Sequence, residues 1–267
     1  MDFGRRIRRR VRRSWVRGRG NVMTKAGRAV ERVIHPRDPR RFAASIPIII
    51  NNFNRLESLV RLLDWLEAAG MINIHILDND SSYPPLLDFY NNTHYAVVRL
   101  NANLGHRALW RTSAYWRLCR SYFVYTDPDV VPNEECPYDA VYQFLVKLRE
   151  YKDVDKVGFG LRIDDLPACY KYKKEVMEWE QRFWKREREP GLFEAKIDTT
   201  FALYRPFSMA RAGAPALRTG FPYVARHWPW YADSNNPSDE DRYYKEMAKP
   251  RLGFWAGKRP RGLDMVY

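Results

Sequence analysis

The sequence predicts an α/β fold, in which a mostly parallel sheet is covered by helices on both faces. Short apolar runs rich in branched residues, which are typical of buried strands, alternate with segments whose apolar residues recur at helical spacing. Clusters of Asp and Asn follow these strands one after another, as expected where parallel strands end at one edge of a sheet. The 267 residues fit one large domain or two small ones.

The predicted elements follow each other in a regular order. Strands are predicted at residues 46–50, 72–77, 95–100, 122–126 and 157–163. Helices are predicted at residues 56–66, 106–118, 139–151 and 170–184. Because parallel strands need a crossover between them, this alternation favours a parallel sheet with helices on its faces.

Charge divides the chain into two parts. Fifteen basic residues against three acidic ones give residues 1–41 a net charge of +12. The remaining chain has 31 basic and 29 acidic residues, and so carries only +2 of the total of +14. We therefore interpret residues 1–41 as a basic arm with a linker and residues 42–267 as the folded domain. The nearly neutral domain argues against chemistry on nucleic acid.

The first twenty residues predict a basic amphipathic N-terminal helix. Phe3, Ile7, Val11 and Trp15 recur every four residues among arginines, so a helix would gather them into one apolar stripe. Such a helix suits the headgroup region of an anionic membrane, where each basic residue contributes about 1 kcal/mol. The alternatives are a disordered tail, a nucleic-acid contact and an organelle-targeting peptide.

The remaining composition points to the cytoplasm. No run reaches the ~18 apolar residues of a membrane span, and the N-terminus lacks the apolar core of a secretory signal. Cys119, Cys136 and Cys169 have no paired spacing, which favours reduced thiols. We expect a cytoplasmic protein that is peripherally associated with the inner face of the membrane through residues 1–20.

Polar clusters occupy four predicted strand ends. They are Asn51-Asn52, Asp78-Asn79-Asp80, residues 101–105 and residues 127–129. Each cluster alone could be turn chemistry, since Asp and Asn favour loops. Four in succession indicate a ligand site, because ligands of parallel sheets bind beyond the carboxyl ends of the strands.

The segment Asp127-Pro128-Asp129 points most directly to chemistry. A divalent ion that bridges two phosphates takes hard oxygen ligands and keeps positions for substrate or water. Two carboxylates one residue apart, directly after a buried strand and stiffened by proline, can reach such an ion. The ion would neutralise charge on a leaving diphosphate. The D-x-D spacing alone is common by chance, so its position after the strand is what makes it a candidate metal site.

Four segments together resemble the ordered motifs of family-2-type glycosyltransferases, which have the GT-A fold. They are residues 48–54, 76–82, 103–105 and 126–130. The resemblance covers residues 46–132 well, as a nucleotide-binding half, and residues 157–247 loosely, as an acceptor half. It leaves the basic arm out. The chain departs from the family pattern in the Asn-Asn-Phe-Asn that follows the first strand and in the proline of the metal motif.

The resemblance implies a nucleotide-sugar donor, a UDP-sugar by default, and Mn²⁺ or Mg²⁺ as cofactor. The donor-binding residues that it implies are Asn51, Asn52, Asp78, Asn103, Gly105 and Asp127. Asn51 and Asn52 would lie near the base, and Asp78 would bind the base or ribose. Asp127 and Asp129 would hold the metal and diphosphate.

The family's catalytic base lies in a Glu-Asp pair that opens a late helix, which Glu240-Asp241 matches in order. Such a carboxylate takes the proton of the acceptor hydroxyl as its oxygen attacks the anomeric carbon. The other candidates are Asp239, Asp233, Asp198 and the pair Asp164-Asp165. Acidic residues at a helix N-terminus are also stabilised by the helix dipole without any catalytic role.

Aromatic residues and one histidine precede this helix. Trp228, Trp230 and Tyr231 could stack on sugar faces, and core packing explains such a cluster equally well. His227 could complete the metal shell, as a histidine does in some GT-A enzymes, although a single histidine is more often structural.

The sequence therefore predicts metal-dependent transfer of a sugar from a nucleotide-sugar donor to a glycan or lipid-linked acceptor, in cell-surface polysaccharide synthesis. The resemblance implies inversion at the anomeric carbon. One alternative is a nucleotidyltransferase, but no Gly-rich phosphate loop follows Ile50. Another is a non-catalytic basic nucleic-acid-binding protein, whose binding would weaken steeply with salt and be lost with the arm. We expect no specific nucleic-acid partner.

Overall fold

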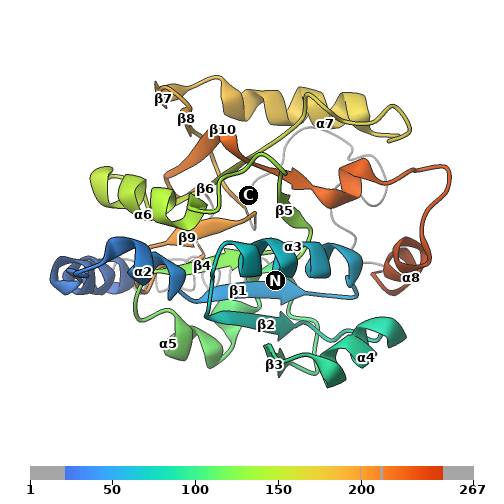
Figure 1. Cartoon of the computed structure of the whole chain (residues 1–267), viewed down its shortest axis with the longest axis horizontal. Coiled ribbons are helices and arrows are strands. Elements are labelled where there is room, and N and C mark those ends of the chain that lie inside the picture. The colour runs from blue at the N-terminus through green and yellow to red at the C-terminus, as the bar shows by residue number, and fades with distance from the viewer. Residues whose placement is uncertain (1–21, 199, 211–212, 249–267) are drawn as a thin grey trace, which may run out of the picture.

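The first half of the sheet is parallel, as the alternation of strands and helices predicts. The computed structural model describes residues 22–198, 200–210 and 213–248, and here the strands lie in the order β3-β2-β1-β4 (Figure 1). They are β1 (Ile48–Asn52), β2 (Ile74–Asp78), β3 (Ala96–Arg99) and β4 (Phe123–Thr126). β1 pairs in parallel with both β2 and β4, so the strand order reverses between β1 and β4. Ligands of open α/β sheets bind beyond the carboxyl ends at such a switch point.

The second half of the 10-stranded sheet is mixed. Its strands are β5 (Val130–Pro132), β6 (Lys156–Leu161), β7 (Glu187–Glu189), β8 (Leu192–Glu194), β9 (Ala202–Tyr204) and β10 (Ala216–His227). β9 runs antiparallel to both β4 and β6, whereas β6 and β10 are parallel to each other. Only β5, β8 and β9 oppose the other described strands in direction. The predicted α/β class with a mostly parallel sheet is therefore confirmed.

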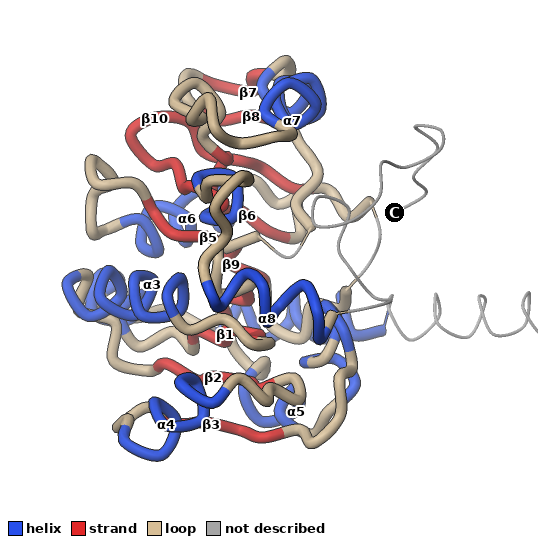
Figure 2. The backbone as a smooth tube through the Cα atoms, turned by 90° about the vertical axis from the view of Figure 1, so that its right-hand side faces the viewer, coloured by secondary structure: helices blue, strands red, loops and turns tan. Residues whose placement is uncertain are grey.

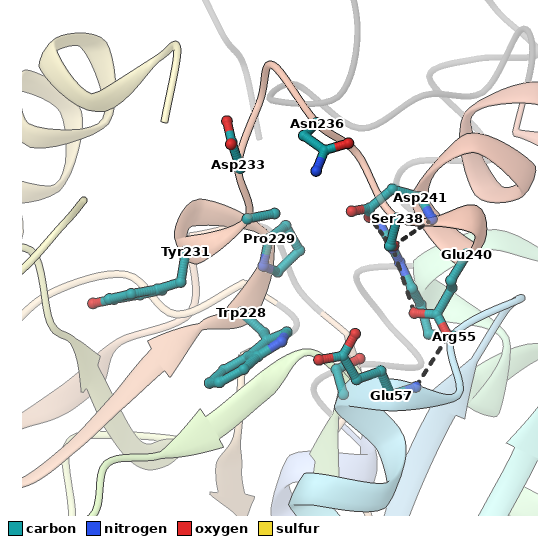
Figure 3. A pocket seen from close by; sticks show the side chains of 12 residues that line it. Arg55, Glu57, Trp228, Pro229, Tyr231, Asp233, Asn236, Ser238, Glu240 and Asp241 are labelled. Atoms are coloured by element: carbon teal, nitrogen blue, oxygen red, sulfur yellow. Dashed lines mark hydrogen bonds and ion pairs between the residues drawn. The ribbon is translucent and has the colours of Figure 1, made fainter. Parts of the chain in front are cut away.

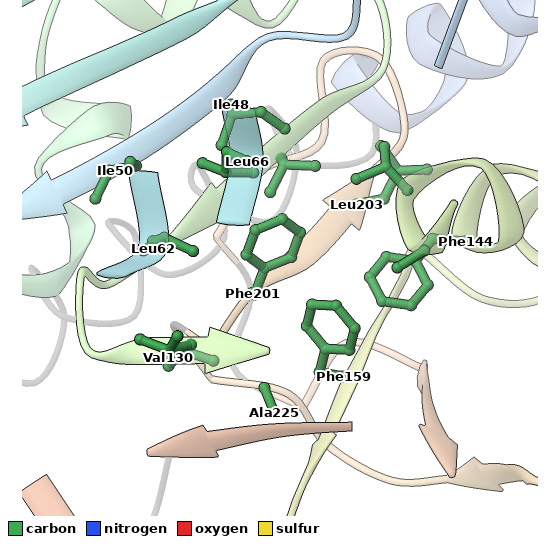
Figure 4. Packing of buried hydrophobic residues seen from close by; sticks show 14 of the residues in the cluster. Ile48, Ile50, Leu62, Leu66, Val130, Phe144, Phe159, Phe201, Leu203 and Ala225 are labelled. Carbon is green, nitrogen blue, oxygen red and sulfur yellow. The ribbon is translucent and has the colours of Figure 1, made fainter. Parts of the chain in front are cut away.

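Both faces of the sheet are covered. The helices are α2 (Pro39–Ala44), α3 (Glu57–Ala68), α4 (Pro84–Asn92), α5 (Ala114–Leu118), α6 (Ala140–Glu150), α7 (Lys173–Glu180) and α8 (Asp239–Met247). Ile48 and Ile50 of β1 belong to the larger hydrophobic cluster with Phe144 of α6 (Figure 4). Ile49 belongs to the smaller cluster with Tyr115 of α5. Because alternate residues of a strand point to opposite faces, β1 contributes to two cores and is buried throughout.

The prediction of one helix over residues 106–118 is wrong. The structure has two 3₁₀ helices, η1 (Gly105–Arg107) and η2 (Leu109–Arg111), before the short α5. Tertiary hydrogen bonds fix this break, since the His106 carbonyl accepts the Tyr125 hydroxyl at 2.9 Å and the Leu104 carbonyl accepts Arg111 at 3.0 Å. The predicted helix over residues 170–184 is shorter, with α7 followed by the 3₁₀ helix η3 (Gln181–Trp184).

An unpredicted helix over residues 22–33 precedes the domain and packs against it. Its Glu31 is paired with Arg205, and both side chains are buried. A Cβ at Gly27 would lie 2.0 Å from the Pro206 carbonyl oxygen, so glycine permits this close approach. Figure 1 shows this helix at the end of the sheet away from α8. The amphipathic helix predicted for the first twenty residues lies outside the described part of the chain.

The described residues include all three cysteines, and their helices can be compared with the length of a membrane span. No helix in them is both long enough and apolar enough to cross a bilayer. The three cysteines are free thiols, and Cys119 and Cys136 are buried. Burial raises the pKa of Cys119 and Cys136, which keeps both thiols protonated and unreactive.

Arg205→Ala should lower the free energy of unfolding by about 3–5 kcal/mol, because the buried Glu31 carboxylate loses its buried partner and keeps only Arg28 and Lys152, each at 3.5 Å. The same change also removes the donor that bonds the Tyr151 and Val154 carbonyls, each at 2.8 Å. Urea denaturation measures the loss. Arg186→Ala is the control, since Arg186 is exposed in its pair with Glu194. A loss no larger than that of the control would contradict the structural role of Arg205.

Candidate functional site

Asp127 and Asp129 lie in the turn between β4 and β5, at the carboxyl edge of the sheet. Pro128 between them is buried, whereas both aspartates are partly exposed. β5 pairs antiparallel with β10 so that Val130 stands opposite His227. This pairing brings His227 Nε2 to 3.8 Å from Asp129 Oδ1. The sheet thus joins two predicted metal ligands that lie far apart in sequence.

The environment of His227 favours its neutral form. Burial lowers the pKa of the imidazole, and the charge of Arg55 adds to this, although Asp129 opposes both. The ring packs against Trp230 with 4.7 Å between centroids. Its Nδ1 is buried without a hydrogen-bond partner among the described residues. A neutral imidazole with an unused nitrogen can bind a metal ion or donate a hydrogen bond to a ligand.

The metal prediction can be judged from the donors present. Within the described ranges, no group of three or more His, Cys, Asp or Glu side chains is arranged to hold a metal ion. Asp129 and His227 form a pair, with Asp127 two residues away. Mg²⁺ and Mn²⁺ sites at phosphates often use one or two protein carboxylates and take the other ligands from the substrate and water. The donor set therefore fits a divalent ion that arrives with a diphosphate.

Arg55, in the loop between β1 and α3, connects this turn to α8. Its Nη1 donates to Asp241 Oδ1 at 2.6 Å and lies 3.6 Å from Glu240 Oε1 (Figure 3). Burial opposes the charge of the guanidinium, but the hydrogen bond and charge of Asp241, together with the charge of Asp129, raise its pKa above the usual value. The guanidinium is therefore a permanent cation between the acidic pair of α8 and the turn at residues 127–129. We call this turn the metal turn, because the sequence predicts a metal ion there.

Tyr244 brings α8 over the same turn. Its ring lies 3.9 Å from the Arg55 guanidinium carbon. Burial raises the pKa of the Tyr244 hydroxyl, Arg55 opposes the rise, and the charges of Asp129 and Asp127 add to it. Figures 1 and 2 show β1 pointing towards α8, which lies across the carboxyl end of the strand. α8 therefore covers part of the candidate site.

The predicted donor-binding residues at β1 and β2 lie side by side. The register pairs Asn52 with Asp78, and the Asn51 and Asn52 side-chain oxygens are buried without hydrogen-bond partners in the described structure. Asp78 is buried and paired with Arg99 Nε at 2.7 Å, and it accepts the Tyr90 hydroxyl at 3.2 Å. Because one strand separates β2 from β4, the backbones at Asp78 and Asp127 are about 10 Å apart.

The loop after β3 is built by turn chemistry. Asn79 accepts the Leu104 backbone N–H at 2.7 Å and donates to the Gly105 carbonyl at 3.2 Å. Asn103 accepts the Gly105 N–H at 3.0 Å, and Gly105 has a φ of 73°. Asn103 and Gly105 therefore shape the loop wall beside β2. The turn-only interpretation accounts for these hydrogen bonds, but not for the buried oxygens of Asn51 and Asn52.

The late carboxylates have different surroundings. Glu240 Oε2 accepts the backbone N–H groups of Leu56 at 2.6 Å and Glu57 at 3.0 Å, so it caps the first turn of α3 from another helix. Asp239 is exposed and paired with Arg242. Asp241 is paired with Arg55, and Asp233 lines the same pocket as Asp241. Asp233, Glu240 and Asp241 all line this pocket, but the cap of α3 already engages Glu240.

The weaker candidates are paired with arginines or are exposed. Arg162 pairs with Asp164 at 2.9 Å, and Arg226 pairs with Asp165 at 2.8 Å. Asp198 is exposed near buried Lys156, whose Nζ donates to the Asp198 carbonyl at 3.3 Å. Burial lowers the pKa of Lys156 to about 8. Nothing in the sequence around Lys156 indicates this burial.

A pocket of about 200 Å³ adjoins the metal turn, between α3, α8 and the 3₁₀ helix η4 (Trp228–Tyr231). We call it the Trp228 pocket, and it is lined by Arg55, Ser58, Trp228, Tyr231, Asp233 and Asp241, among others. Figure 3 shows Trp228, Pro229 and Tyr231 on one side and Arg55, Glu240 and Asp241 on the other. The Trp228 backbone N–H donates to the Asp129 carbonyl at 2.7 Å, so the pocket and the metal turn share a wall.

Sequence reasoning missed Arg55 and Tyr244 in this arrangement. Arg55 follows the polar Asn51-Asn52-Phe53-Asn54 segment, and this position is the one signal that could have drawn attention to it. Tyr244 lies one helical turn after the predicted acidic pair, on the face of α8 that meets Arg55. A helical projection of α8 could have placed it beside Glu240 and Asp241.

No family model matches this chain, and neither does any curated protein. Among solved structures, a mycobacterial protein aligns with 80% of this chain and 79% of its own chain, with a TM-score of 0.40 and 13% sequence identity. Likeness at this level identifies no function, so any functional conclusion depends on the site.

Glu240→Ala should lower the free energy of unfolding by about 1–2 kcal/mol, because the first turn of α3 loses its acceptor for two backbone N–H groups. Glu240→Gln keeps a carbonyl oxygen at the same place and should lose less than half as much. Urea denaturation measures both losses, and hydrogen exchange at Leu56 and Glu57 should accelerate only in the alanine variant. Equal behaviour of the two variants would show that Glu240 does not cap α3.

Proposed function

We propose that the chain is a metal-dependent glycosyltransferase of GT-A type, which transfers a sugar from a nucleotide-sugar donor to a hydroxyl group of a glycan or lipid-linked acceptor. The observation that carries this proposal is the meeting of Asp129, His227 and the Arg55–Asp241 pair at one edge of the sheet. These residues come from the β4–β5 turn, β10, the β1–α3 loop and α8, which lie far apart in the sequence.

The topology supports a nucleotide at this edge. The strand order reverses between β1 and β4, which is where open α/β sheets bind nucleotides. Asn51, Asn52 and Asp78 lie on one side of this point, and Asp127 begins the turn on the other. The span of about 10 Å between Asp78 and Asp127 suits a nucleoside that lies across β1 with its diphosphate at the turn. UDP is the default nucleotide, because nothing at Asn51 and Asn52 distinguishes one base from another.

Asp127, Asp129 and His227 are the residues that would hold Mn²⁺ or Mg²⁺, with the diphosphate completing the ligand set. When bound, the ion supplies Lewis-acid stabilisation of the leaving diphosphate. Arg55 adds a fixed positive charge beside the same turn, since both Asp129 and Asp241 keep it protonated. The protein thus offers an anionic leaving group a buried cation as well as the candidate ligands.

Asp241 is the carboxylate that we propose as the base. It lines the Trp228 pocket and contacts Arg55, which in turn feels the charge of Asp129. Asp241 would take the proton of the acceptor hydroxyl as its oxygen bonds to the anomeric carbon and the bond to the diphosphate breaks. Attack from the pocket side, opposite the diphosphate, would invert the anomeric carbon. Asp233 on the open side of the pocket is the alternative base.

Membrane association through the basic arm is a second part of this proposal. A lipid-linked acceptor is held at a membrane surface, and residues 1–20 contain arginines with an apolar residue every four positions. The inner face of the membrane offers the anionic lipids that such an arm would bind, so we propose a cytoplasmic, peripheral location.

Asp129→Asn should abolish sugar transfer and remove the stabilisation by nucleotide that depends on Mn²⁺, because the variant keeps the side-chain shape but loses the charge. Thermal unfolding with UDP, GDP, CMP and dTDP, each with and without Mn²⁺, measures this. A ligand at 100 times its Kd should stabilise the parent protein by about 2.7 kcal/mol. Asp88→Asn, on the exposed surface of α4, is the control. Unchanged transfer in the Asp129 variant would refute the metal assignment.

Deletion of residues 1–20 should abolish binding to vesicles that contain anionic lipid and leave nucleotide-dependent stabilisation unchanged. The deletion stops short of the helix at residues 22–33, because that helix packs on the domain through Glu31. Vesicle sedimentation at low and high salt measures the effect, with neutral vesicles as the control. Retained vesicle binding would count against the membrane role. So would a deletion variant that loses binding to DNA and keeps binding to vesicles.

A further inference from the structure

The Trp228 pocket is lined by more carboxylates than cations. Four carboxylates line the pocket, from Glu57, Asp233, Glu240 and Asp241, whereas Arg55 is the only cation among its described lining residues. Arg61 pairs with Glu57 at 3.1 Å, and its guanidinium carbon lies 4.3 Å from the centre of the Trp228 ring. These two arginines leave the carboxylates in excess. Asp233 accepts the Asn235 backbone N–H, and no ion pair joins it to a cation in the described structure. The pocket is therefore negatively charged.

The same pocket presents groups that recognise hydroxyls and sugar rings. Ser58 is 2% exposed, lines the pocket, and its hydroxyl has no hydrogen-bond partner among the described residues. A buried hydroxyl without a partner is costly, so this oxygen indicates a polar ligand or water at that point. Trp228 and Tyr231 form the opposite wall, with their rings 6.3 Å apart and 24° from parallel. The aromatic surface that Arg61 does not cover can pack against the apolar face of a sugar ring.

We propose that the Trp228 pocket binds a sugar unit without anionic groups, and that it ranks amine-bearing sugars above neutral ones and neutral ones above carboxylate-bearing ones. Glu57 and Asp233 set this order through their charge, and Trp228 provides affinity for all three. The role of the bound sugar as acceptor rests on the proposed transferase activity, whereas the binding order does not. Acceptors that end in a uronic acid or a phosphate are disfavoured by repulsion.

The binding order can be measured without donor nucleotide or metal. The probes are the methyl glycosides of glucosamine, glucose and glucuronic acid at pH 6, where the amine is protonated and the carboxylate is ionised. Saturation-transfer NMR titrations of the full-length protein give the three dissociation constants. At low ionic strength we expect roughly threefold or more between successive probes, which is the effect of one charge in a partly hydrated site. The differences should shrink at high salt.

Two variants distinguish the contribution of the carboxylate charges to binding from that of the Trp228 ring. Glu57→Gln combined with Asp233→Asn should bring the three constants together, with little change for the glucoside. Trp228→Ala should weaken all three probes by a similar factor and keep their order. Asp88→Asn removes one exposed carboxylate from α4, outside the pocket, and should leave every constant unchanged.

Each outcome decides the proposal. Tighter binding of the glucuronide, an order that survives the Glu57 and Asp233 changes, or saturation of none of the probes would overturn it. If the three sugars bind in the expected order but no sugar is transferred, the pocket proposal stands and the transferase proposal fails. If sugar is transferred but the binding order differs, the transferase proposal stands and the pocket proposal fails.

Discussion

The guanidinium of Arg55 is buried where three distant parts of the chain meet, and the geometry of the candidate site depends on it. It bonds Asp241 of α8, packs on the ring of Tyr244, and lies within the field of Asp129. Burying a cation is unfavourable unless carboxylates compensate it, and burying these carboxylates is unfavourable without the cation. The contacts of Arg55 with Asp241 and Tyr244 therefore hold α8 over the metal turn, and α8 forms one wall of the Trp228 pocket.

Much of the first half of the fold could be predicted from the sequence, because three of its four strands are buried on both faces. β1, β2 and β4 are short runs of apolar residues, and such runs identify central parallel strands. β10 escaped prediction because Gly220 and Pro222 interrupt it, and its pairing with β6 shifts register between Thr219 and Val224. The broken helix over residues 106–118 escaped because hydrogen bonds to distant residues such as Tyr125, and not local propensity, decide its path.

The candidate site could be predicted only where a residue's role follows from its place on a strand. Asp127 and Asp129 end a buried strand, so their position at the sheet edge follows from the pattern around them. Glu240 and Asp241 are neighbours of similar chemistry, yet one caps α3 and the other pairs with Arg55. That difference depends on how α8 docks, and no local pattern contains it. Arg55 lies in a loop, where charge usually means exposure, and its burial is likewise a tertiary effect.

The helix at residues 22–33 bears on how the protein could work at a surface. It is joined to the domain through Glu31 and Arg205 at the amino edge of the sheet, whereas the Trp228 pocket lies beside the carboxyl edge. An anchor attached through this helix would therefore leave the mouth of the site uncovered. A protein anchored in this way could reach chains that extend away from the bilayer. It could then act repeatedly without dissociating from the membrane.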